Sequence, residues 1–572
     1  MTPVRPVAKL PRRQRVRMES CPSSPWRFNG PMTRLHLFLL PLALVLACTT
    51  PDSPCRADAP VAVEELARQV DAAIERETLA GANAAVAPPS SDEIFLRRVW
   101  LDIVGDIPAP EDVIAFALDP APDKRAAVVR GLLADEQYGV NWARYWRDVV
   151  FSRRVEDRAL LAANAMEADL SAQLNANRPW SEIAAEFITA RGDVRENGAT
   201  AIIMAQDGRT EETTAEMARI FLGIQIQCAQ CHDHPYDEYR REEFHELAAF
   251  FPRIAVRPVR SAARRSFEVV VSDRPQRRGR GNNDRLPMPE HRMPDLGNPD
   301  AAGRQMQPKF FLTGAKMPFG TPDDERRGTL ADWLTGNEWF ATALVNRMWA
   351  ELVGEGFYTP IDDLGPGRTA LAPTAAKLLS EQFVASGYDV KRLIETICAT
   401  DAYQRESRPR RESDQPAFAA NVPQPLRADQ LYNAITSALE IAEPAPRRQE
   451  FRRPSGDATR RGGFNATFGF DPSEPRDEIV GSIPQSLALM NSPQLAAAMR
   501  ADRRTLLGQL EQQIESDEQM IAELYLRLLS RQPTVDELAT TSAYFESVAD
   551  RPASVEDLAW ALLNSAEFQH RR

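Results

Sequence analysis

The residues with the clearest chemical character form the stretch Cys228-Ala229-Gln230-Cys231-His232-Asp233-His234-Pro235. Cys-x-x-Cys-His is the attachment motif of c-type haem, in which both thiols form thioethers and the imidazole binds the iron. The motif therefore predicts haem c as the cofactor, held by Cys228, Cys231 and His232. No distal ligand is singled out; the first four methionines after the motif are Met288, Met293, Met306 and Met317.

Two other interpretations of this stretch stay open. Cys228, Cys231, His232 and His234 are also suitable ligands for zinc or iron, with His232 and His234 as the imidazole ligands. Such closely spaced ligands cannot easily surround one ion, so a distant carboxylate or a further histidine, His245 or His291, would complete the shell. An incomplete shell suits a catalytic metal and implies a metal-dependent hydrolase or lyase. Alternatively, a Cys228–Cys231 disulfide makes the cluster structural, as in a surface scaffold.

Asp362-Asp363 is a second candidate for acid–base chemistry. Adjacent carboxylates in a loop bounded by Gly and Pro can bind a cation or act on a sugar. Neighbouring side chains more often point apart, and Asp is common in turns, so we favour a structural role. Arg347 is predicted to be a buried ion-pair partner.

A helix is predicted to deliver the cysteine motif. Thr213-x-x-Glu216 is a capping box, and apolar residues recur at helical spacing from Met217 to Ile224. If this helix continues, Cys228 and Cys231 fall on its core-facing side.

Helical periodicity is predicted through most of the remaining chain. Helices are expected at 110–118, 124–134, 138–150, 160–175 and 179–190, and a strand at 266–272. Trp142, Tyr145 and Trp146 have the spacing of core aromatic residues. The fold class is mainly α, with two helical domains, at 61–252 and 323–572, joined by an Arg/Pro/Gly-rich segment, 253–322, with minor β structure.

The N-terminal 47 residues are predicted to be a signal region. A basic start at Met32 leads into an apolar run too short to cross a bilayer, and Met32 is the expected true start. Val45-Leu46-Ala47-Cys48 resembles a bacterial lipobox, which predicts lipidation of Cys48. Residues 48–60 would then form a tether, and the protein would be exported and lipid-anchored in the periplasm or at the cell surface.

Composition limits the possible partners. The 572 residues carry a net charge of −12, although the signal region itself is basic. An acidic body has no general affinity for nucleic acid, so none is expected as a partner. The expected partners are a membrane, through the N-terminal lipid, and either a redox partner or a cell-surface polymer.

Several sequence blocks resemble those of exported planctomycete proteins that join a cytochrome-c-like domain to a planctomycete-type domain of unknown function. In the first half the matching blocks are 95–102, 177–180 and 221–235; in the second half they are 345–349, 362–364, 425–430, 490–493 and 562–568. The resemblance implies this domain pairing and no assigned reaction. The haem motif and the export signal together predict extracytoplasmic electron transfer or redox chemistry as the role. Whether the chain is an enzyme stays open.

Overall fold

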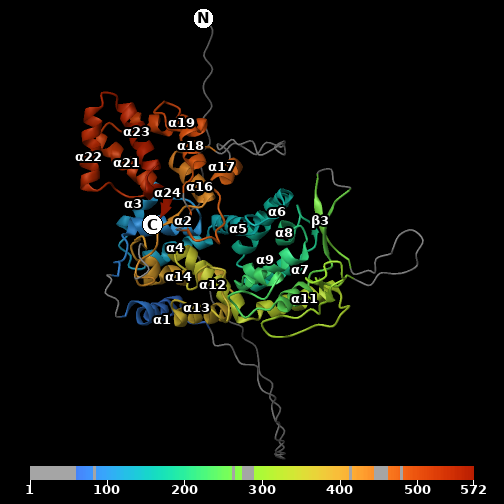
Figure 1. Ribbon diagram of the computed structural model, residues 1–572. Coiled ribbons are helices and arrows are strands. Elements are labelled where there is room, and N and C mark those ends of the chain that lie inside the picture. The colour runs from blue at the N-terminus through green and yellow to red at the C-terminus, as the bar shows by residue number, and fades with distance from the viewer. Residues whose placement is uncertain are drawn as a thin grey trace, which may run out of the picture. The chain divides into compact units, whose positions relative to one another are not determined.

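The computed structural model describes residues 60–80, 86–260, 265–272, 289–410, 415–442, 461–476, 479 and 481–572. The predicted signal region, Cys48 and nearly all of the predicted tether lie outside these residues, as does Met288. Within them the fold is mainly α-helical with seven short strands, as predicted (Figure 1). No helix in the described ranges has the length and apolar character needed to span a bilayer.

The first half of the chain is built from short helices. Its α-helices are α1 (Val63–Ile74), α2 (Asp92–Ile103), α3 (Pro110–Leu118), α4 (Lys124–Ala134), α5 (Glu136–Phe151), α6 (Ala163–Asn175), α7 (Trp180–Thr189), α8 (Ala201–Ala205), α9 (Thr210–Leu222) and α10 (Arg241–Ala248). A π-helical turn, η1 (Glu75–Leu79), follows α1, and three 3₁₀ segments, η2 (Asp157–Ala162), η3 (Gly198–Thr200) and η4 (Ile226–Gln230), connect later elements.

The second half is also helical. It contains α11 (Asp323–Thr335), α12 (Glu338–Val353), α13 (Pro373–Ala385), α14 (Val390–Ala399), α15 (Asp401–Gln404), α16 (Ala428–Ala438), α17 (Arg461–Phe468), α18 (Ile483–Asn491), α19 (Pro493–Ala498), α20 (Leu506–Gln513), α21 (Asp517–Leu529), α22 (Val535–Ser547), α23 (Arg551–Leu563) and α24 (Ala566–Gln569).

The strands form three small antiparallel sheets. The largest has the order β1-β3-β2, from β1 (Gly192–Asp193), β2 (Ile254–Pro258) and β3 (Phe267–Val271), with Ile254 opposite Val271. Strands β4 (Arg292–Met293) and β5 (Arg304–Gln305) pair with each other, as do β6 (Gln424–Pro425) and β7 (His570–Arg571). The predicted strand at 266–272 is thus confirmed as β3.

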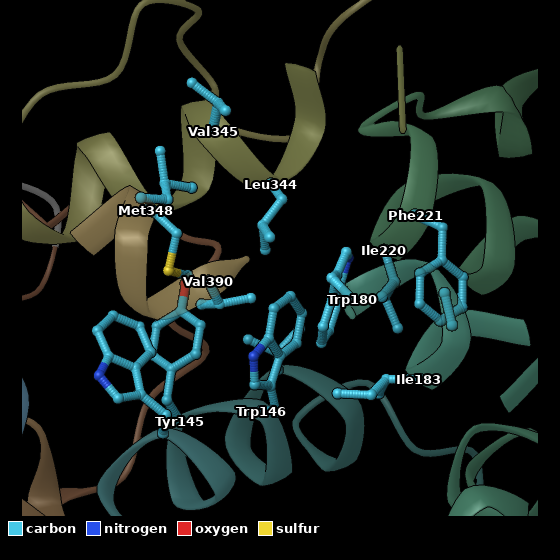
Figure 2. Close-up of a cluster of buried hydrophobic side chains, with 14 of the residues drawn as sticks. Tyr145, Trp146, Trp180, Ile183, Ile220, Phe221, Leu344, Val345, Met348 and Val390 are labelled. Atoms are coloured by element: carbon cyan, nitrogen blue, oxygen red, sulfur yellow. The ribbon is translucent and has the colours of Figure 1, made fainter. Parts of the chain in front are cut away.

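The main hydrophobic core draws on both halves of the sequence. Helix α9 packs against α12, α7 against α11, and α1 against α13. Figure 2 shows side chains of α5, α7, α9, α12 and α14 meeting in one cluster. Within it Trp146 stacks on Trp180, with ring centroids 4.7 Å apart. The predicted core role of Trp142, Tyr145 and Trp146 is confirmed, because all three side chains are buried.

A second buried cluster is formed mainly by residues of α16 to α24. Polar contacts join it to the first half: the buried Arg97 side chain of α2 donates to the carbonyl oxygen of Leu528, 2.9 Å away. Arg571 donates to the Asp102 carboxylate at 2.6 Å, and both side chains are almost completely buried. The buried charges of Arg571 and Asp102 compensate each other, and the Arg97 guanidinium is held by hydrogen bonds to oxygen atoms.

Candidate functional site

The helix that leads to the cysteine motif ends before the motif begins. Helix α9 starts at Thr210 and stops at Leu222, because Gly223 takes a left-handed conformation with φ of 67°. The prediction that Thr213 caps this helix is wrong, since Thr213 lies buried within it. The helix therefore does not continue to the cysteines, and they do not lie on its core-facing side.

The cysteines lie instead in and beside the 3₁₀ segment η4. Cys228 belongs to η4 and Cys231 directly follows it. In a 3₁₀ helix, side chains three positions apart lie on the same side, so this geometry suits a group shared by both thiols. Both cysteines are exposed and carry free thiols. Cys398, by contrast, is buried, and burial raises the pKa of its thiol well above the ordinary range.

His232 has the tautomer that metal binding through Nε2 requires. Its Nδ1 lies 2.7 Å from the carbonyl oxygen of Asp233. A carbonyl oxygen can only accept, so Nδ1 carries the proton and the lone pair is on Nε2. Such a contact from the second ring nitrogen is the usual way in which a ligating imidazole is oriented.

His234 is held in the opposite tautomer. Its Nδ1 accepts hydrogen bonds from the backbone N–H groups of Asp237, at 3.0 Å, and Tyr236, at 3.3 Å. The proton is therefore on Nε2. The carboxylate of Asp237, 3.2 Å from the same nitrogen, is paired with Arg368 at 3.1 Å. The ring of His234 thus stabilises the turn at 234–237, and it has no free lone pair for a metal ion.

His245 and His291 form a buried pair beside the motif. Nε2 of His245 donates to the carbonyl oxygen of Gln230 at 3.0 Å, so its Nδ1 accepts from Nε2 of His291 at 2.8 Å. The two rings stack with centroids 5.1 Å apart. Burial lowers the pKa of each imidazole to about 4, so both rings are neutral at pH 7.

The described residues contain no group of three or more His, Cys, Asp or Glu side chains placed to hold a metal ion. His245 and His291 contact each other and the motif's backbone, as described above. Of the downstream methionines, Met306 and Met317 are buried, and Met293 lies in β4. The distal ligand of a haem at His232 is therefore not identified among them.

Asp362 is a buried ion-pair partner. Its carboxylate accepts from Arg219 at 3.0 Å and from Gln225 at 2.9 Å, and it lies 3.6 Å from Arg347. Burial alone would raise the pKa of Asp362, but the charges of Arg219 and Arg347 outweigh burial and lower that pKa. The structural role favoured for this residue, and the predicted ion pair of Arg347, are confirmed.

Asp363 has a different environment although it is the next residue. Its carboxylate pairs with Arg368 at 3.1 Å, and both side chains are more than a quarter exposed. Arg368 also contacts Asp237, which lies in the loop after the cysteine motif. The loop around residues 362–368 thus touches the chain on both sides of the cysteine motif, at Gln225 before it and at Asp237 after it.

Sequence reasoning missed three residues of the buried polar network around Asp362: Arg219, Gln225 and Ser473. The sequence did carry a signal for Arg219, because Glu216 and Arg219 are the only charged residues between Thr213 and Leu222. All of α9 from Thr213 onward is buried, so these charges had to find partners within the fold. The distant Ser473, which accepts from Arg219 at 2.9 Å, has no comparable signal in the sequence.

Two family models match the chain. Residues 69–256 match PSCyt2, a protein of unknown function (DUF1549), and residues 326–461 match PSD1, a protein of unknown function (DUF1553). The chain therefore pairs two domains of unknown function, as the resemblance implied. No curated protein and no solved structure matches the chain. The ion pair between Arg219 and Asp362 joins the two matched segments.

Proposed function

We propose that the protein carries a covalently attached c-type haem on Cys228 and Cys231, with His232 as the proximal iron ligand, and that it transfers electrons outside the cytoplasm. The supporting observation is the protonation state of His232, whose Nδ1–H donates to a backbone carbonyl and leaves Nε2 available. A bound haem would supply a one-electron couple.

The donor set fits this group. Two free, exposed thiols in and beside one 3₁₀ turn are accessible for attachment, in which each S–H adds across one vinyl group. The acidic residues that follow, Asp233 and Asp237, are held by hydrogen bonds to Arg241 N–H and by the Arg368 ion pair. These contacts fix the loop that follows the motif.

A metal-dependent hydrolase or lyase at the same residues is less well supported. His234 uses its Nδ1 lone pair on two backbone donors, so a site made by all four side chains would require this turn to open. The structural-scaffold alternative requires a Cys228–Cys231 disulfide, whereas the structure has both thiols free.

Location completes the proposal. Haem c is attached outside the cytoplasm, which agrees with the sequence of residues 32–48, a signal region with a lipobox ending at Cys48. We propose a lipid-anchored protein in the periplasm or at the cell surface, acting with a redox partner.

The test is an absorption spectrum of the exported protein, produced in cells with a cytochrome maturation system and then denatured. Covalent haem stays with the unfolded polypeptide, so a haem band is expected after denaturation. Cys228→Ser/Cys231→Ser should abolish the band, whereas Cys398→Ser, a control at the buried cysteine, should keep it. A colourless wild-type protein would refute the proposal, and metal analysis of that protein would then separate a metal site from a scaffold.

A further inference from the structure

A cavity of about 550 Å³ lies at the C-terminal end of α12, away from the cysteine motif. It is bordered by Ala350 to Gly356, by the loop at 359–361, by residues 472–476 and by the end of the chain near His570. Its volume is within the range typical of small-molecule sites, roughly 300–1,000 Å³. Five prolines form much of its wall: Pro360, Pro409, Pro423, Pro472 and Pro475. A wall of proline rings is rigid and largely apolar.

The charged side chains that border this cavity are three carboxylates and three guanidinium groups, and two carboxylate–guanidinium pairs among them are in contact. Glu351 binds Arg476 and lies 3.3 Å from Arg427. Glu355 binds Arg410. Because these carboxylates and guanidinium groups neutralise each other, the cavity offers fixed hydrogen-bonding groups without a large excess of either charge.

Ser473 presents an unused hydroxyl proton at the cavity wall. Its Oγ accepts from Arg219 at 2.9 Å and from Arg347 at 3.1 Å, which occupies both lone pairs. The residue is 3% exposed, and its hydroxyl donates to no acceptor among the described residues. A buried donor of this kind is costly unless a ligand or water accepts from it.

His570 adds an acceptor. Its Nδ1 donates to the carbonyl oxygen of Ala566 at 2.9 Å, so Nε2 carries the lone pair. Burial lowers the pKa of His570, which keeps the ring neutral at pH 7. The cavity thus combines a hydroxyl donor, an imidazole acceptor, paired carboxylates and guanidinium groups, and apolar walls.

We propose that this cavity is a binding site for an uncharged, polyhydroxylated ring compound of the neutral sugar class, one or two rings in size. Hydroxyl groups act as donors and acceptors at once, which suits the donor of Ser473 and the acceptor of His570. The C–H faces of sugar rings suit the proline walls, and the balanced charges give no advantage to an ionic ligand.

The site stands apart from the proposed haem site. Ser473 does not contact the motif itself in the described structure; it is linked to Gln225 through Arg219 or Arg347 and then Asp362. Sugar binding therefore requires no haem, and it can be present or absent whether or not haem is attached.

Saturation-transfer NMR on the protein from residue 60 to 572 tests the proposal. The probes are cellobiose, mannobiose, galactobiose and N,N′-diacetylchitobiose, each compared with galactose 6-sulfate. At least one neutral disaccharide should give a signal. Ala566→Trp, which places a large ring at an exposed position on the cavity wall, should abolish that signal.

Ala497→Trp is the matched control, because Ala497 is exposed on α19 and does not border the cavity. It should leave the signal unchanged. The proposal fails if no neutral disaccharide gives a signal, if Ala566→Trp retains the wild-type signal, or if galactose 6-sulfate binds more strongly than every neutral probe.

Discussion

At the scale of single residues, Asp362 and Asp363 show how neighbours acquire different roles. The carboxylate of Asp362 is 1% exposed and is surrounded by Arg219, Gln225 and Arg347, whereas that of Asp363 is 27% exposed and pairs with Arg368. Removing one member of a buried ion pair leaves an uncompensated charge, which costs far more than losing a surface pair.

The first prediction compares these two positions. Asp362→Asn should lower the free energy of unfolding by about 3–5 kcal/mol, because buried Arg347 loses its counter-charge and buried Arg219 is left with Glu216 as its ion-pair partner. Asp363→Asn, the matched control, should cost at most about 1 kcal/mol. Urea denaturation measures both, and equal losses would contradict the assigned environments.

The second prediction concerns pH and the His245–His291 pair. Unfolded histidine has a pKa of about 6.5, whereas burial lowers the folded value to about 4 for both residues. The unfolded state therefore binds more protons between these values, and stability present above pH 6.5 is lost as the pH falls toward 4. Each extra proton contributes a slope of about 1.4 kcal/mol per pH unit.

His291→Gln removes one of these titrating groups. The dependence of the unfolding free energy on pH between 6.5 and 4 should therefore be shallower than in the wild type. A wild-type slope in the His291 variant would show that the buried pair does not titrate as described.

At the scale of elements, the sequence predicted the presence of helices better than the residues at which they begin and end. Two helices, at 110–118 and 124–134, do have the predicted bounds, because each is followed by a short polar segment that can be recognised in the local sequence. The capping box at Thr213 failed because α9 already begins at Thr210, and Thr213 lies in the part of the helix that is buried on all sides. Helical phase could not show where α9 stops, because the stop depends on the conformation of Gly223.

The third prediction tests that stop. Gly223→Ala should cost about 1 kcal/mol or more, because φ of 67° disfavours a side chain and the new Cβ would lie 3.0 Å from Leu364 Cδ1. Gly131→Ala, within α4 and with open space around it, should instead stabilise by roughly 0.5–1 kcal/mol. Thermal unfolding of both variants measures the difference, and shifts of the same sign would contradict the account.

At the scale of the described residues from 60 to 572, the core is shared between the two predicted helical segments. Trp146 of α5 and Trp180 of α7 lie in one cluster with Leu344 and Met348 of α12 (Figure 2). Sequence periodicity identified Trp146 as a core residue but could not pair it with Trp180 or with α12, because contacts between distant helices depend on shape and not on local pattern. The division at 253–322 stays a prediction.

The fourth prediction follows from this shared core. A fragment of residues 60–272 lacks α12 and α13, against which α9 and α1 pack, and should expose apolar surface. It should show no cooperative thermal transition by circular dichroism, whereas residues 60–572 should unfold cooperatively. A sharp transition of the fragment alone would show that the first segment is an independent domain.

The central claim, covalent haem on the cysteine motif, is tested most directly by the intact mass of the exported protein. The account predicts the mass of the mature, lipidated polypeptide plus one haem, and a Cys228→Ser/Cys231→Ser protein without the haem. The mass of the lipidated polypeptide without haem, either with free thiols or with the loss of two hydrogens that a disulfide produces, would contradict it.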